Sequence, residues 1–135
     1  MKYPIAIEEG SETQAYGVVV PDIPGCYSAG DTLDEAMDNA KEAICLHLEM
    51  LAEEGVTPPQ ASQVKDHVKN AAYAGWVWAV IDIDPEPFLG KSEKVNVTLP
   101  RLLTYQIDNL IKQDKRYTSR SHFLQVAAMH ELHQR

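Results

Sequence analysis

Apolar positions in the first third of the chain predict a small antiparallel sheet. Apolar runs at 3–7 and 15–20 flank a polar turn, which is typical of a β-hairpin. Two prolines and a glycine within 21–25 break the second strand, and residues 26–29 can form a third. The aromatic and β-branched run 76–83 has the length of a further strand, which we expect to join this sheet.

A long amphipathic helix is predicted over residues 33–54. Thr32 and Glu35 have the spacing of a capping box, and Gly55 is well placed to end the helix. A short helix over 62–70, capped by Ser62, is a weaker prediction. Apolar residues recur at helical spacing, namely Leu33, Ala36, Met37, Ala40, Ile44, Leu48 and Leu51. The first part of the chain therefore predicts an α+β fold, in which one long helix packs on a small antiparallel sheet.

The last 45 residues predict one strand followed by two helices. Residues 94–99 alternate, so that Val95, Val97 and Leu99 share one face and the polar residues share the other. Pro100 at a first helical position begins one helix, and Ser119 can cap the next. The expected apolar helix positions are Leu103, Ile107, Leu110, Ile111, Phe123, Leu124, Ala127, Ala128 and Leu132.

A single strand with two helices in about 45 residues leaves its backbone edges unpaired and its apolar faces exposed. A second copy of the chain corrects both faults, because the two strands can pair and the four helices can share one core. We therefore expect this C-terminal region to be a homodimer.

The charge of the chain changes sign along its length. Residues 1–90 contain 4 Lys and Arg against 16 Asp and Glu, whereas residues 91–135 contain 8 against 4. The balances of −12 and +4 account for the net charge of −8. An acidic half suits a basic protein partner and a basic half suits nucleic acid, although one acidic domain with a solvated basic tail stays an alternative.

The change of sign coincides with a segment rich in proline and glycine. We therefore expect a first domain over 1–84, a linker over 85–92 and a second domain over 93–135. Neither a basic leader nor an apolar run of about 20 residues is present, which predicts a cytoplasmic protein. Cys26 and Cys45 are expected to be free thiols.

Residues 94–132 resemble a ribbon-helix-helix DNA-binding domain. The resemblance rests on Val-Asn-Val-Thr-Leu-Pro at 95–100, the helix at 103–111, and Ser-Arg-Ser-x-Phe-Leu at 119–124. It implies that two protomers pair their strands into a ribbon in the major groove of operator DNA. His122 departs from the family pattern, where an acidic residue often completes a capping box with Ser119.

The same resemblance assigns DNA-contacting roles to individual residues. The polar face of the strand would contact bases through Lys94, Asn96 and Thr98, because an amide pairs with adenine and a threonine methyl contacts thymine. The start of the second helix would hold a phosphate through backbone N–H groups, and its residues are Ser119, Arg120 and Ser121. Arg120 would add a cation.

Residues 3–84 resemble the HicB antitoxin family, which has a partial RNase H-like fold. The resemblance rests on Pro-Asp-Ile-Pro-Gly-Cys at 21–26, Gly-Asp-Thr-Leu-Asp-Glu-Ala at 30–36 and Asn-Ala-Lys-Glu-Ala at 39–43. It implies an antitoxin of a type II toxin–antitoxin system that inhibits a HicA-like toxin, a small basic ribonuclease that cleaves mRNA, and autorepresses its operon. The motifs do not identify toxin-contacting residues. Pairing of first domains would convert dimers into tetramers.

Two other functions stay open. An RNase H-like fold invites a nuclease, but strand 3–7 lacks acids, and Asp22 and Asp31 fit turn and cap roles better than metal binding. We expect no catalysis, no cofactor and no metal. The third hypothesis is a plain repressor whose first domain senses a ligand or oligomerises. His130 with His133 is expected to be a solvated pair, and Trp76 with Trp78 to pack in a core or against a partner.

Overall fold

The computed structural model describes residues 1–134 and divides the chain into two compact units, Met1–Lys91 and Ser92–Arg135. Each unit is described by itself. No helix among the described residues is both long and apolar enough to cross a membrane.

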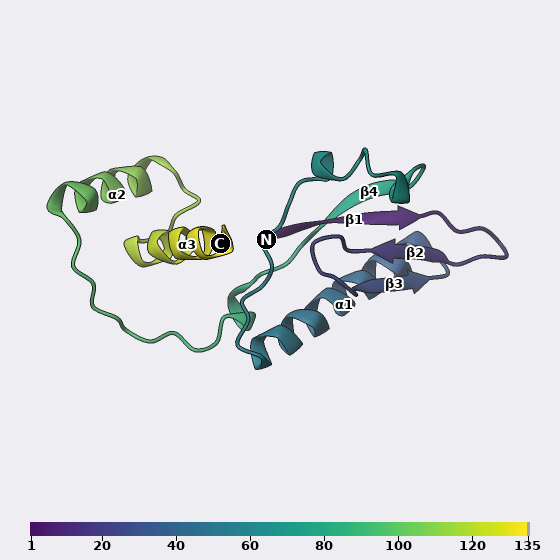
Figure 1. Cartoon of the computed structure of the whole chain (residues 1–135), viewed down its shortest axis with the longest axis horizontal. Helices are drawn as coiled ribbons and strands as arrows, with labels where there is room; N and C mark the ends of the chain where they lie inside the picture. The colour runs from purple at the N-terminus through teal and green to yellow at the C-terminus, as the bar shows by residue number, and fades with distance from the viewer. Residues whose placement is uncertain (135) are drawn as a thin grey trace. The chain divides into compact units, whose positions relative to one another are not determined.

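The first unit contains a four-stranded antiparallel sheet in the order β3-β2-β1-β4 (Figure 1). Its strands are β1 (Lys2–Glu8), β2 (Tyr16–Val19), β3 (Tyr27–Gly30) and β4 (Val77–Asp82). Ala6 at the centre of the sheet lies opposite Val19 on one side and Trp78 on the other. The predicted hairpin, the third strand and the joining of 76–83 to the sheet are confirmed.

Pro4 lies in the central strand β1, where a missing N–H ordinarily disrupts the ladder. Met1 and Ile83 exchange two hydrogen bonds, from Met1 N to Ile83 O at 2.8 Å and from Ile83 N to Met1 O at 2.7 Å. Because antiparallel pairs alternate, the backbone of Pro4 faces away from β4. On that side β2 has already ended, since Val19 pairs with Ala6. The proline therefore removes no sheet hydrogen bond.

The helix α1 (Leu33–Glu53) packs on one face of this sheet, as predicted. The Thr32 hydroxyl accepts a hydrogen bond from the backbone N–H of Glu35 at 3.1 Å, which caps the N-terminus. Gly55, with φ of 78°, ends the helix in the left-handed conformation, and the N–H of Val56 donates to the carbonyl of Leu51. Every fourth residue is buried, in the series Ala36, Ala40, Ile44 and Leu48.

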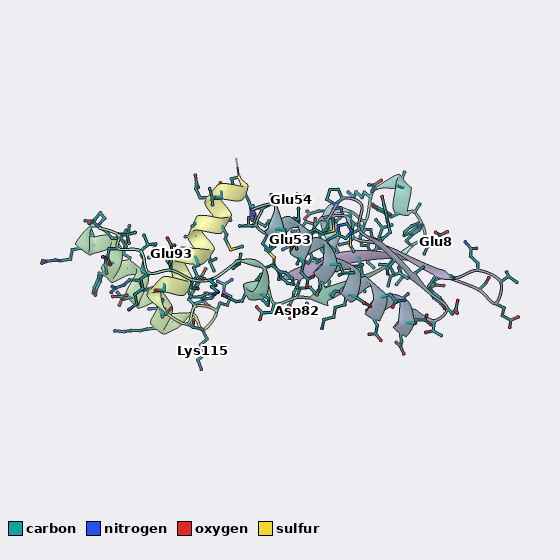
Figure 2. The ribbon with its side chains drawn as sticks, turned by 90° about the horizontal axis from the view of Figure 1, so that it is seen from below. Glu8, Glu53, Glu54, Asp82, Glu93 and Lys115 are labelled. Carbon is teal, nitrogen blue, oxygen red and sulfur yellow. The ribbon has the colours of Figure 1, made fainter. Side chains whose placement is uncertain are left out.

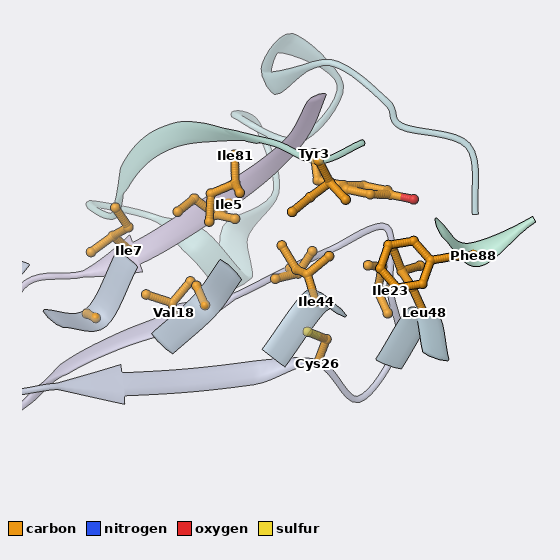
Figure 3. Packing of buried hydrophobic residues seen from close by; sticks show 14 residues of the cluster. Tyr3, Ile5, Ile7, Val18, Ile23, Cys26, Ile44, Leu48, Ile81 and Phe88 are labelled. Atoms are coloured by element: carbon orange, nitrogen blue, oxygen red, sulfur yellow. The ribbon is translucent and has the colours of Figure 1, made fainter. Parts of the chain in front are cut away.

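The core lies between α1 and the inner face of the sheet, where side chains of alternate β1 residues meet the buried stripe of the helix (Figure 3). Phe88, from the short 3₁₀ turn η3 (Glu86–Phe88), closes one end of this core and is only 9% exposed. We expected 85–92 to be a linker. The structure instead includes the chain through Lys91 in the first unit, because burial of Phe88 holds this segment against the core.

The prediction of a short helix over 62–70 is wrong. The segment between α1 and β4 lies beside β4 and contains two 3₁₀ turns, η1 (Val64–Asp66) and η2 (Ala71–Tyr73). Ser62 does not cap a helix, because its N–H and hydroxyl both bind the Asp22 carboxylate. Val68 is 49% exposed, so the segment also lacks the apolar stripe that stabilises a helix on a core.

The second unit contains the two predicted helices, α2 (Arg101–Gln113) and α3 (Arg120–His133). The Ser119 hydroxyl caps α3 by accepting from the N–H of His122 at 3.1 Å, as predicted, whereas Pro100 is the N-cap of α2 and not its first helical residue. Residues 91–100 form no strand within the single chain. Ile107 is the one buried side chain among residues 92–134.

Tyr3→Phe tests the tie between the core and the chain after α1. The Tyr3 hydroxyl donates to the Pro59 carbonyl at 2.6 Å, and burial, with a smaller effect of Asp22, raises the pKa of Tyr3 to about 12. We expect the variant to lose about 1 kcal/mol of unfolding free energy at neutral pH.

The wild type should also lose stability between about pH 10 and pH 12, because the unfolded tyrosine releases its proton first. Denaturant unfolding across pH 7–12 measures both effects. Tyr27→Phe is the control, since that side chain is 66% exposed. A Tyr3→Phe variant that retains the full alkaline loss of the wild type would contradict this assignment.

Candidate functional site

Two regions carry the functional residues predicted from sequence, and the first is the segment before α2. Lys94, Asn96 and Thr98 are all exposed, and so are the apolar side chains between them, with Val95 66% and Val97 61% exposed. No ladder hydrogen bond involves residues 93–99 within the described chain. Both faces of this segment therefore lack a partner in the monomer.

A groove of about 760 Å³ runs between this segment and α3. Lys94 and Asn96 line it from the segment, and Ser121 and Gln125 line it from the helix. Two of the three predicted base-contacting residues thus share a groove with one predicted phosphate-contacting residue. Thr98 is exposed but does not line this groove.

The N-terminus of α3 holds the predicted phosphate-contacting residues in the first turn. The hydroxyl of Ser119 is already used by its cap hydrogen bond to His122. The His122 ring accepts from the N–H of Thr118 at 3.3 Å, one residue before the Ser119 N–H that the acidic residue of a capping box would bind. The backbone N–H groups of Arg120 and Ser121 point along the positive end of the helix dipole, where an anion is favoured.

Sequence reasoning missed the partner of Arg120. Its Nη2 lies 2.8 Å from Oδ2 of Asp108 and its Nε 3.2 Å from Oδ1, which ties α3 to α2 through a two-pronged ion pair. The hydrogen bond from Arg120 lowers the pKa of Asp108, and the same bond raises the pKa of Arg120. A carboxylate twelve residues away gives no local sequence signal. The guanidinium predicted to meet a phosphate is therefore already neutralised in the free chain.

A second arginine is paired in the same way. Arg116 binds Asp114, with Nη2 2.6 Å from Oδ2, and lies over the ring of Tyr117. Hydrogen bonds from Arg116 lower the pKa of Asp114. The exposed cations of this unit that form no ion pair within residues 92–134 include Lys94, Arg101 and Lys115.

In the first unit, the carboxylate of Asp22 lies in a side-chain network. It accepts from the Ser62 N–H at 2.8 Å and from the Ser62 hydroxyl at 2.7 Å, and the same hydroxyl lies 2.6 Å from Nε2 of His67. A nucleophilic serine needs the histidine between it and the carboxylate, whereas here serine stands in the middle. The network therefore ties the turn after β2 to the segment after α1, and the arrangement is not that of a hydrolase.

The residues of the nuclease hypothesis do not converge. Asp22 is committed to Ser62, while Asp31 is exposed in the turn before α1. Over residues 1–134, no group of three or more His, Cys, Asp or Glu side chains is arranged to hold a metal ion. His130 contacts the side-chain amide of Gln134.

The tryptophans pack within the first unit. Tyr73 contacts Trp76 and Trp78 edge to face, with ring centroids 5.4 and 5.5 Å apart, and His67 stacks on Trp78 at 5.8 Å. This packing is the use that the sequence favoured over base stacking. Cys26 and Cys45 are free, as expected.

The proline-glycine and Gly-Asp-Thr motifs have structural roles. Gly25 adopts φ of 81° in the turn that leads to buried Cys26. A Cβ on Gly30 would lie 2.5 Å from the backbone nitrogen of Ala36, so only glycine lets α1 approach β3 this closely. The hydroxyl of Ser28 and the amide of Asn39 add hydrogen bonds between α1 and β3. These motifs therefore position α1 on the sheet.

Comparisons with known proteins bear on the family of the chain. The family model described as "HicB_like antitoxin of bacterial toxin-antitoxin system" matches residues 3–128. An uncharacterized 14.9 kDa protein from the rep-hol intergenic region of Haemophilus phage HP1 (strain HP1c1) is 42% identical over 132 residues, which covers 98% of each chain.

Solved structures give the same result. The crystal structure of the Burkholderia pseudomallei antitoxin HicB is similar with a TM-score of 0.77 and 40% identity, covering 98% of each chain. A chain from the HicA3 and HicB3 toxin-antitoxin complex has a TM-score of 0.54 and 32% identity, and the match covers 63% of this chain and 100% of that chain. The α+β fold with a small antiparallel sheet and the resemblance to HicB antitoxins are thus confirmed, and this chain belongs to the HicB-like antitoxin family of bacterial toxin–antitoxin systems.

Proposed function

We propose that this chain binds and inhibits a HicA-like ribonuclease toxin through its first unit and represses its own operon by binding operator DNA as a dimer through its second unit. The observation that carries the proposal is the division of charge and burial between the two units. The acidic unit has a core of buried apolar residues, whereas in the described part of the basic unit every apolar side chain except Ile107 is at least partly exposed.

Charge supports toxin binding by the first unit. Its −12 balance over residues 1–90 is suited to cover the basic, RNA-binding surface of a small ribonuclease, and complementary charge speeds association. Figure 2 labels some of the carboxylates of this unit, including Glu53, Glu54 and Asp82. The HicA3 and HicB3 toxin-antitoxin complex is a precedent among the structural neighbours.

Exposure supports dimerisation of the second unit. Val95 and Val97 are more than 60% exposed, and Leu103, on the apolar face of α2, is 43% exposed. A second copy would bury these side chains and pair residues 94–99 into a two-stranded ribbon. The ribbon would then present Lys94, Asn96 and Thr98 from both protomers on one face, which a major groove admits.

Phosphate binding at α3 would follow from the same geometry. The N–H groups of the first turn can hold a phosphate oxygen next to the ribbon, since Ser121 lines the same groove as Asn96. Contacts of this kind fix the register of the protein on DNA, and the ribbon side chains select the sequence.

Co-expression tests the antitoxin half of the proposal. We expect a HicA-family toxin encoded beside this chain to arrest growth when expressed alone, and the full chain to restore growth. Residues 1–91 should restore growth in part, because they contain the acidic unit. Continued arrest in the presence of well-expressed full chain would refute this function.

Asn96→Ala tests base recognition. We expect the variant to lose about 1–3 kcal/mol of binding free energy at one operator position and to bind random DNA as the wild type does. Fluorescence anisotropy with a set of operator point mutants measures the loss position by position. Equal weakening on operator and random DNA would argue against a base contact.

Arg120→Ala tests the phosphate contact, with Asp108→Asn as the matched control. Loss of the arginine should weaken binding to all sequences and reduce the slope of log K against log salt by about one per contact. Asp108→Asn breaks the same ion pair but keeps the cation, so its salt slope should match or exceed that of the wild type. If both variants only lower the melting temperature and leave the salt slope unchanged, Arg120 serves the α2–α3 contact alone.

A further inference from the structure

An apolar pocket of about 280 Å³ opens at the C-terminal end of α1, within the first unit. Ile23 and Pro24 from the turn after β2 form one wall, and Met50 and Leu51 from α1, with Val56 after it, form the other. A cavity of about 150 Å³ is enough for benzene, so this pocket admits one aromatic or branched aliphatic side chain.

The surroundings of the pocket are apolar as well. Met50 is 56% exposed and Val56 47% exposed at its mouth, and Leu46 lies one helical turn before Met50 with 54% exposure. Large apolar side chains grouped at a concave site are typical of a protein-binding surface, and methionine adapts its shape to the partner.

The end of α1 beside the pocket is acidic and electrostatically unfavourable in the free chain. Glu54 lines the pocket, whereas Glu49 and Glu53 lie in the last two turns of α1 without lining it, and the last turn contains no basic residue (Figure 2 labels Glu53 and Glu54). The C-terminus of a helix carries the negative end of its dipole, which disfavours carboxylates there. None of the ion pairs within residues 1–134 involves these three glutamates.

We infer that this pocket, with the glutamates at the end of α1 beside it, forms the docking surface for the toxin, which inserts one large apolar side chain flanked by lysine or arginine. The inference rests on the proposed function and specifies the surface that performs it. Lysine or arginine on the toxin would relieve the repulsion between the glutamates and the C-terminal end of α1. The apolar side chain inserted into the pocket would be the buried centre of the interface, and the charged pairs would lie around it. A second copy of this chain fits less well, because a two-fold contact would bring two sets of glutamates together.

The test uses the full chain and a catalytically inactive form of the HicA-family toxin encoded beside it. We expect the double variant Glu53→Lys, Glu54→Lys to bind this toxin at least tenfold more weakly. Its melting temperature should equal or exceed that of the wild type, because lysine suits a helix C-terminus. A purely structural role of the two glutamates would not combine weaker binding with retained stability.

The matched control is Glu8→Lys, Glu9→Lys, which makes the same change in net charge at two adjacent exposed glutamates in the first hairpin. The binding of this variant to the toxin should weaken by less than threefold at physiological salt, because the two substituted positions lie away from the pocket.

A second pair of variants tests the apolar anchor. Met50→Ala should weaken toxin binding at least fivefold, whereas Val68→Ala, at an exposed valine that does not line the pocket, should not.

The outcomes separate the inference from the proposed function. If the wild-type chain does not bind the toxin, the proposed function is overturned. If the wild type binds and the Glu53, Glu54 and Met50 variants bind equally well, the docking surface lies elsewhere and the inference alone is overturned. A change of oligomeric state in the Met50 variant, seen by light scattering with no toxin present, would assign the pocket to self-association and would also overturn it.

Discussion

The close contact between α1 and the sheet is the constraint on which the first unit depends. A stripe of alanines, isoleucine and leucine at every fourth position of the helix is buried in the core between α1 and the sheet. That contact requires glycine at position 30, the tight turn ending in Gly25, and the closure by Phe88. The family motifs are therefore conditions for packing, and the outward surface of α1 is left free to carry acidic residues.

Features governed by local chemistry were predictable from the sequence. Periodicity located α1, α2 and α3, and the caps at Thr32 and Ser119 follow from side-chain chemistry within a few residues. The strands of the sheet followed from β-branched and aromatic runs bounded by turn residues. Alternation divides residues 94–99 into two faces, whereas the DNA-contacting roles of Lys94, Asn96 and Thr98 come from the resemblance to ribbon-helix-helix domains and stay a prediction.

Features that depend on distant partners were not predictable. Ser62 has the chemistry of a helix cap, but the Asp22 carboxylate, forty residues earlier, takes its hydrogen bonds. Phe88 lies among prolines and a glycine that suggest a linker, but in the folded chain its side chain is buried in the core. The pairing of Arg120 with Asp108 likewise joins two helices whose charges look independent in the sequence. In each case the interacting residue lies too far away in the sequence for a local pattern to indicate the contact.

The ion pairs of two arginines reduce the number of free cations that the second unit can present to an anionic partner. Counting charges gives +4 over residues 91–135, but Asp108 and Asp114 hold two arginines in ion pairs, so the field of one protomer comes mainly from dispersed lysines and Arg101. Since phosphate binding grows with the number of cations presented together, one such unit would be a weak ligand for DNA. Under the proposed function, pairing two copies would double the cations on one face and bury the exposed valines of the segment. The same event would therefore complete the core and assemble the proposed DNA-binding surface, and repression would then depend on dimer concentration.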